Sequence, residues 1–197
     1  MLSLDSFRHL LEISSKSKSE RGQHLSAFHM KVKMSNGCEI PLECAFQGSK
    51  VFDRSGPFTD LYWKAPKEAK RHPRLKESGP LTGFKFENFS WPLEPKTVFY
   101  DWLYVTFLKS WREWAEKLYS YRGFIDVEFN PHRSINCQAR SCALFLSLMR
   151  RNILDEATKS PEAFITTLRS FEYHPQLRPE QGWEAPLVQR SHNTVRG

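Results

Sequence analysis

The chain has 197 residues, 40% hydrophobic and 26% charged, which is typical of one folded domain with a substantial core. It has no apolar run near the roughly 20 residues that cross a bilayer, and its N-terminal stretch MLSLDSFRHLLEIS does not resemble a secretory signal. We therefore expect a cytoplasmic protein that does not enter a membrane, and the net charge of +7 favours partners that carry negative charge.

The N-terminal part of the chain predicts a helix followed by a β-hairpin. Apolar residues at helical spacing predict a helix over residues 4–13, and the polar stretch 14–23 predicts a loop. Apolar and polar side chains then alternate over 28–34, as in a half-buried strand, and Asn36-Gly37 predicts a tight turn.

Prolines punctuate the next part of the chain. After a short return strand over 38–40, Pro41 is expected to open a helix. Residues 53–63 predict a loop, and Pro66 is expected to start a short basic helix. Four prolines and two glycines predict that 72–95 is mostly loop, with room for a short strand near GFKFENF.

The strongest helical pattern covers residues 96–109 and is rich in aromatic side chains. Ser110 and Glu113 form a capping-box pattern that predicts the start of a further helix. Residues 124–130, FIDVEFN, alternate again and predict a strand.

The C-terminal part predicts two more helices. Asn136 is expected to cap a helix over 137–152, and residues 161–170 predict a shorter one. We therefore expect an α+β fold, a mainly helical single domain over 1–175 packed around a small antiparallel sheet, with an irregular tail over 176–197.

The cysteine spacing argues against a metal centre. Cys38, Cys44, Cys137 and Cys142 form no CxxC pair, so they predict reduced, buried thiols, and neither a metal nor a cofactor is expected.

A basic segment, KAPKEAKRHPRLK over residues 64–76, carries a net charge of +5. Such a segment can neutralise phosphates of a nucleic acid, and a solvated helix face is the alternative. The candidate nucleic-acid contacts are Lys64, Lys67, Lys70, Arg71 and Arg74.

Two polar stripes are the candidates for chemistry. Helical spacing places Glu43, Gln47 and Lys50 on one face, and strand alternation does the same for Asp126, Glu128 and Asn130. If the stripes converge, they form a pocket with several carboxylates and a lysine, the groups that commonly cleave N- and O-glycosidic bonds. The alternative is that both stripes are solvated.

Four stretches carry a resemblance to a known family: LSAF (25–28), ECAFQGSKVF (43–52), WPLEPKTVFYDWLY (91–104) and DVEFNPHRSINCQAR (126–140). Together they closely resemble the DarT-associated NADAR antitoxins, within the wider NADAR superfamily, over about residues 10–170. Two positions depart from the wider pattern, since Cys44 stands where relatives have His and Ala27 where they have Asn.

The resemblance implies a hydrolase that removes ADP-ribose from guanine bases in DNA or RNA, where a DarT-type toxin has attached it. It implies a catalytic role for Glu43, with Asp126 and Glu128 as further acids. Lys50 and Lys16 are the candidate amines for an imine with the ring-opened sugar. The candidate substrate-binding residues are Gln47, Gly56, Thr59, Asp60, Trp91, Asn130, Asn136, Gln138 and Arg140.

Three other functions stay open at this point. The protein could bind ADP-ribose without cleaving it, block its toxin sterically, or act as an N-glycosidase on a small nucleotide metabolite. The basic segment argues against the last, because a small substrate does not require it.

Overall fold

The structure, a computed structural model, describes residues 10–126 and 136–172. The elements in chain order are β1 (Leu10–Glu12), α2 (Glu20–His24), β2 (Lys31–Lys33), β3 (Glu39–Pro41), α3 (Leu42–Gly48), β4 (Lys50–Phe52), the 3-10 helix η1 (Thr59–Trp63), α4 (Pro66–Arg71), α5 (Arg74–Glu77), β5 (Leu81–Phe86), β6 (Phe89–Trp91), α6 (Val98–Ser110), α7 (Arg112–Ala115), the 3-10 helix η2 (Glu116–Ser120), β7 (Gly123–Ile125), α8 (Gln138–Arg150), α9 (Leu154–Ala157) and α10 (Pro161–Glu172).

The strands in the described part of the chain form three small sheets. β1 pairs with β7 in parallel, β2 pairs with β3 in an antiparallel hairpin, and β4, β5 and β6 form an antiparallel sheet. The α+β class is thus confirmed, although the strands are divided between three sheets and one pair is parallel.

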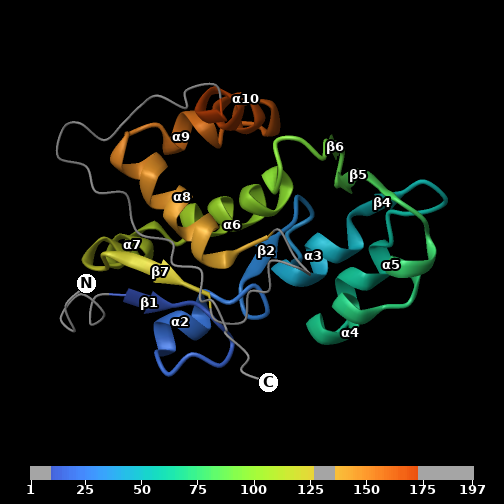
Figure 1. Cartoon of the computed structure of the whole chain (residues 1–197), viewed down its shortest axis with the longest axis horizontal. Helices are drawn as coiled ribbons and strands as arrows, with labels where there is room; N and C mark the ends of the chain where they lie inside the picture. The colour runs from blue at the N-terminus through green and yellow to red at the C-terminus, as the bar shows by residue number, and fades with distance from the viewer. Residues whose placement is uncertain (1–9, 127–135, 173–197) are drawn as a thin grey trace, which may run out of the picture.

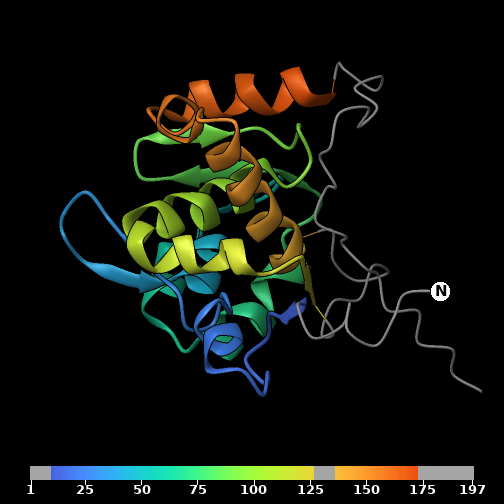
Figure 2. The same ribbon diagram turned by 90° about the vertical axis from the view of Figure 1, so that its left-hand side faces the viewer.

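Helices α6 and α8 lie side by side at the centre of the molecule, and α9 and α10 lie above them in Figure 1. The β1–β7 pair and α2 lie below on one side, and α4, α5 and the β4–β5–β6 sheet lie on the other. Figure 2 shows the β2–β3 hairpin projecting from the body and α10 lying across the top.

An aromatic cluster joins α3, α6 and the three-stranded sheet. Phe99 of α6 stands at its centre, with ring centroids 5.0 Å from Phe84 and 5.4 Å from Trp91. Trp102, on the same helix, contacts Phe164 of α10 at 5.4 Å. Large buried aromatic rings supply much of the stability of a domain of this size. The cluster therefore fixes α3, the helix that carries Glu43, against α6.

Two local predictions near the N-terminus are wrong. Residues 10–12 form a strand and not the end of a helix, because their backbone pairs with β7 and Leu11 is buried against the core. The stretch 14–23, predicted as a loop, contains the start of α2.

Further differences concern the central and C-terminal parts. Residues 72–95 hold α5, β5 and β6, with more regular structure than the prolines predicted. Cys38 is exposed, whereas the other three cysteines are buried as expected. The cap of α8 is Cys137 and not Asn136, and it makes no side-chain capping hydrogen bond.

Several predictions are confirmed with adjusted ends: the hairpin at Asn36-Gly37, the helix after Pro41, the basic helix at Pro66 and the long helices α6, α8 and α10. Residues 127–130 of the predicted strand and the predicted tail over 176–197 lie outside the described residues.

Candidate active site

Glu43 lies at the N-terminal end of α3 with 5% of its surface exposed. Its backbone N–H donates to the Ala27 carbonyl at 3.0 Å. Its Oε1 accepts a hydrogen bond from Gln47 Nε2 at 2.9 Å and lies 3.7 Å from Lys70 Nζ. A buried carboxylate needs such partners, because removal from water disfavours its charge. Glu43 and Gln47 therefore do not belong to a solvated helix face.

Gln47 has one hydrogen-bonding atom to spare. Its side chain is as buried as that of Glu43, and its Oε1 accepts no hydrogen bond from the residues that the structure describes. Buried amide oxygens are normally paired. A donor from a bound ligand would satisfy this one.

Lys50 lies near Glu43 but not on α3 as predicted. The helix ends at Gly48, and Lys50 starts β4 because its backbone pairs with Phe84 of β5. Its ammonium lies 5.0 Å from the centre of the Phe46 ring. Burial lowers the pKa of the Lys50 amine to about 8, an effect that Glu43 opposes and Lys70 reinforces.

Asp126 follows β7 directly, and Gln138 holds it in place. Asp126 Oδ2 accepts hydrogen bonds from the Gln138 backbone N–H at 3.3 Å and from its Nε2 at 3.4 Å. Gln138 Oε1 in turn accepts the Ala27 N–H at 2.7 Å. Since the carbonyl of Ala27 binds the N–H of Glu43, one hydrogen-bonded chain connects Asp126 to the residue that carries the other carboxylate.

Tyr100 of α6 is close enough to both acids for their charges to act on its phenol. Burial raises the pKa of its phenol well above the ordinary value, and the charges of Glu43 and Asp126 raise it further. Its ring also packs edge-on against Phe46, with centroids 5.3 Å apart. The electrostatic coupling and the hydrogen-bonded chain both link Glu43 and Asp126 to one region of the molecule.

Lys16 lies in an exposed turn after β1. Because β1 and β7 run in parallel, the segment after β1 and Asp126 after β7 leave the pair at the same end. The topology thus places the Lys16 turn at the edge where Asp126 lies, whereas Lys50 approaches from the side of α3.

Arg140, a predicted ligand of the diphosphate, is ion-paired with Asp101, and about half of its side chain is exposed. Its Nη1 lies 2.6 Å from Asp101 Oδ2, and the same carboxylate accepts hydrogen bonds from Thr97 and Ser141 at 2.6 Å each. Asp101 is fully buried on α6, and the sequence analysis missed it. Its signal was a single acid within the aromatic run VFYDWLY, since buried charges are rare unless they are paired.

Other predicted ligands lie apart from the acids. Trp91 is 3% exposed and belongs to the aromatic core, so it forms no wall of an open cavity. Thr59 and Asp60 line a separate groove, and Asp60 is ion-paired with Arg74. A side chain at Gly56 would come within 2.4 Å of the Lys50 carbonyl, so this glycine allows its loop to pack on β4.

Cys44 replaces the histidine of the wider family with an inert thiol. Burial first, and then the charges of Glu43 and Glu68, raise its pKa to about 11. Its Sγ donates a hydrogen bond to the Lys64 carbonyl at 3.1 Å. A thiol that stays protonated is a poor nucleophile, so Cys44 takes a packing role.

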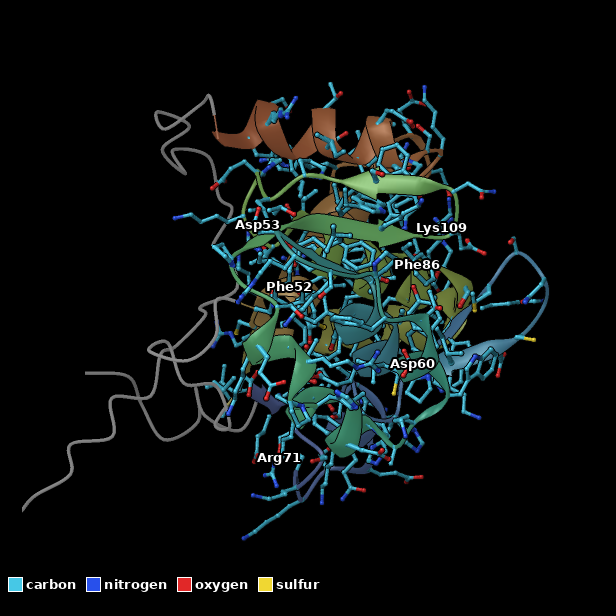
Figure 3. All side chains as sticks on the ribbon, turned by 90° about the vertical axis from the view of Figure 1, so that its right-hand side faces the viewer. Phe52, Asp53, Asp60, Arg71, Phe86 and Lys109 are labelled. Carbon is cyan, nitrogen blue, oxygen red and sulfur yellow. The ribbon has the colours of Figure 1, made fainter. Side chains whose placement is uncertain are left out.

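The basic segment divides into engaged and open cations. Lys64 pairs with Glu68 at 2.7 Å, Lys70 with Glu43, and Arg74 with Asp60. Three further cations are exposed and form no ion pair within the described residues: Lys67, Arg71 and Lys76. Figure 3 shows Arg71 at the edge of the molecule, and α4 places it on the same helix as Lys70.

The remaining predicted site residues lie at the edge of the described ranges or outside them. Glu128 and Asn130 lie outside the described residues, and Asn136 lies just before the first turn of α8. Among the described residues no group of His, Cys, Asp and Glu is arranged to hold a metal ion, and none of their helices is long and apolar enough to span a membrane.

The fold and site define an α+β protein with a buried carboxylate, Glu43, linked through hydrogen bonds to the half-buried Asp126, and a nearby amine of lowered pKa. The family model for the DarT1-associated NADAR antitoxin matches residues 1–177, and the chain belongs to this family. No curated protein matches the chain. The family membership confirms the resemblance found in the sequence and gives the protein an antitoxin role of the NADAR type.

Proposed function

We propose that the protein removes ADP-ribose from guanine bases in DNA by hydrolysing the N-glycosidic bond between C1 of the distal ribose and the guanine amino group. The partner is a DarT-type ADP-ribosyltransferase toxin, in keeping with the description of the family. The observation that carries the proposal is the convergence of Glu43 and Asp126, joined through Ala27 and Gln138.

The two carboxylates divide the work of bond cleavage. Asp126 Oδ2 accepts two N–H donors, an arrangement that suits a carboxylate that stabilises positive charge at C1. Glu43 is then the group that gives a proton to the leaving guanine amine. General acid catalysis of this kind is worth roughly 10²–10⁴-fold in rate.

Lys50 supplies a second element of the mechanism. With a pKa of about 8, about a tenth of this amine is neutral at pH 7 and able to attack carbon. The Lys50 nitrogen adds to C1 of the ring-opened sugar and its proton passes to the Glu43 carboxylate. Glu43 returns this proton to the guanine nitrogen as that amine leaves, and water then hydrolyses the lysine imine to free ADP-ribose. Lys16 is the alternative amine, on the Asp126 side of the site.

The test is release of ADP-ribose from an oligonucleotide that carries ADP-ribosylated guanine. Glu43→Gln and Asp126→Asn are each expected to lose about 100-fold or more in rate while circular dichroism shows an unchanged fold. Glu68→Gln, an exposed acid on α4, is the matched control and should keep the wild-type rate.

Full turnover by both site variants would refute the assignment. Tight binding of ADP-ribose without turnover by the wild-type chain would identify a binding module, and release from a free nucleotide metabolite alone would identify a small-molecule glycosidase.

A further inference from the structure

Trp63, at the end of η1, presents its indole to water. Its side chain is 63% exposed, although the two preceding residues, Leu61 and Tyr62, are buried. The Tyr62 hydroxyl lies 2.9 Å from Ser49 Oγ, and its ring contacts Phe86. The indole therefore projects from a firmly held segment.

A groove of about 590 Å³ lies beside this indole. Its walls come from three parts of the chain: Met34 at the β2–β3 turn, Pro57 before η1, and Lys85 and Glu87 at the end of β5. This volume falls in the range of sites for small planar ligands. Neither Glu43 nor Asp126 lines the groove, so it is distinct from the candidate active site.

Lys85 is the cation that the groove offers to a phosphate. Glu87 accepts the backbone N–H of Ser35 at 2.6 Å, and Asp60 is ion-paired with Arg74. Lys85 is exposed and forms no ion pair with any residue in the described ranges. Arg74 thus compensates the charge of Asp60, whereas Lys85 and Glu87 both stay exposed at the groove.

The chain continues from Trp63 directly into the basic segment. Lys67 and Arg71 on α4 are exposed cations, and Lys70 of the same helix reaches Glu43. Helix α4 therefore connects the segment that carries Trp63 to the lysine that contacts Glu43. A strand of nucleic acid that follows these cations would lead from one site to the other.

We propose that Trp63 stacks on an unpaired base of the nucleic-acid strand that carries the modified guanine, while Lys85 and the exposed cations of α4 contact phosphates. An indole stacks on any base, so this contact adds affinity without sequence preference. The inference rests on the proposed function for the identity of the strand, but it concerns binding outside the reacting centre.

The test measures binding of the full chain to an unmodified, fluorescein-labelled single-stranded oligonucleotide by fluorescence anisotropy. Trp63→Ala should weaken binding about tenfold, the loss expected for one stacked base, and leave the salt dependence unchanged. Trp63→Phe should keep most of the affinity, because a phenyl ring also stacks. Lys85→Ala should lower both the affinity and the salt dependence.

Trp111→Ala is the matched control, since it removes another exposed indole, 46% accessible, at the end of α6. The proposal is overturned if the Trp63→Ala chain binds as tightly as this control, if the wild-type chain does not bind the oligonucleotide, or if Trp63→Ala weakens binding of purified toxin and leaves binding of the oligonucleotide unchanged. Selective loss of binding with no hydrolysis by the wild-type chain would refute the proposed function and support this inference.

Discussion

At the scale of single residues, the fold places two amines, one exposed and one partly buried, beside a buried acid. One acid, Glu43, interacts with two amines: it forms an ion pair with Lys70, and its charge acts on Lys50. Glu43 stabilises the charge of Lys50, but burial and the repulsion of Lys70 outweigh it. Lys50 is therefore partly neutral near physiological pH, which is the form required of a nucleophile.

The lowered pKa of Lys50 predicts a specific pH dependence of stability. Its pKa is about 8 in the folded chain and 10.5 ordinarily, so between these values the unfolded chain binds more protons. The contribution of Lys50 to the free energy of unfolding therefore rises with pH over this window. We expect Lys50→Met to stabilise the protein most at pH 7, with the gain shrinking toward pH 10.5, as measured by urea unfolding.

The comparison must be made as a difference between variant and wild type. The pKa of Cys44 is raised to about 11, so this thiol lowers stability above about pH 9 in both chains and cancels in the difference. Lys67→Met, at an exposed position on α4, is the control and should show no such trend. A gain for Lys50→Met that stays constant from pH 7 to 10.5 would contradict the lowered pKa.

At the scale of elements, buried Asp101 joins α6 to the start of α8. Its two oxygens accept hydrogen bonds from Thr97, Arg140 and Ser141. These bonds fix the first turn of α8 and with it Gln138, which donates to Asp126. Asp101, within the core, therefore orients the helix that carries Gln138.

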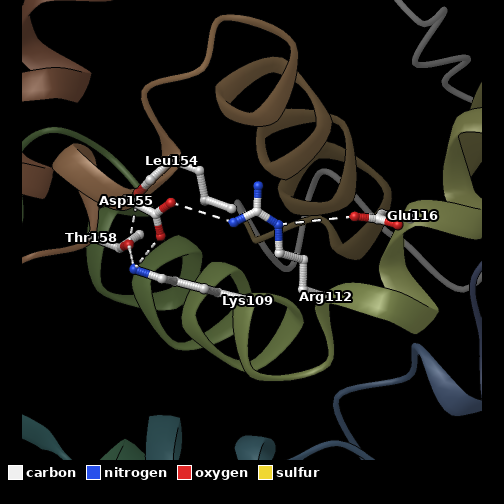
Figure 4. A network of polar contacts seen from close by, with 6 residues as sticks. All are labelled: Lys109, Arg112, Glu116, Leu154, Asp155 and Thr158. Carbon is white, nitrogen blue, oxygen red and sulfur yellow. Dashed lines mark hydrogen bonds and ion pairs between the residues drawn. The ribbon is translucent and has the colours of Figure 1, made fainter.

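We expect Asp101→Ala to destabilise the protein by about 2–3 kcal/mol, since it leaves a buried hydroxyl and a guanidinium without their acceptor. Chemical denaturation measures the loss. Asp155→Ala is the control: Asp155 pairs with Lys109 and Arg112 in the network of Figure 4, but it is fully exposed, so its removal should change stability little. Equal effects of the two variants would show that burial of Asp101 does not matter.

Local patterns predicted the elements whose partners are close in sequence. The hairpin at Asn36-Gly37 and the pairing of Glu43 with Gln47 one helical turn later both followed from spacing alone. The same patterns failed for residues 10–12, whose strand conformation depends on a partner more than 100 residues away in β7. The periodicity of a short segment does not reveal such a contact, because pairing with a distant strand overrides local propensity.

The candidate site shows the same limit at the level of side chains. The sequence offered Glu43 and Asp126 as acids that could share a pocket, but it did not predict that Gln138 bridges them or that Lys50 lies on a strand. Trp91 was assigned to the ligand because aromatic residues suit both cores and binding sites, and only packing decides between them.

At the scale of the whole molecule, the cations behind the net charge of +7 differ in whether an acid of the same chain pairs with them. Within the basic segment, the partners of Lys64, Lys70 and Arg74 are acids of the same chain. Under the proposed function, attraction to a nucleic acid would depend on the cations of this segment without an acidic partner, which are Lys67, Arg71 and Lys76. The cations available for long-range attraction and Lys70, which pairs with Glu43, are therefore different residues of one segment.

The salt dependence of binding tests this division. Each cation that neutralises a phosphate of a single strand contributes about 0.7 to the slope of log affinity against log salt. Replacing Lys67, Arg71 and Lys76 together with alanine should therefore make the slope shallower by about 2. Fluorescence anisotropy at salt concentrations from roughly 50 to 200 mM, where counterion release changes the affinity strongly, measures this slope. The matched control places alanine at Lys117, Arg122 and Arg169, exposed cations on η2, before β7 and on α10, all distant from α4 in Figure 1. If both triple variants lose the same slope, the protein attracts nucleic acid through its total charge, and the basic segment has no special part in binding.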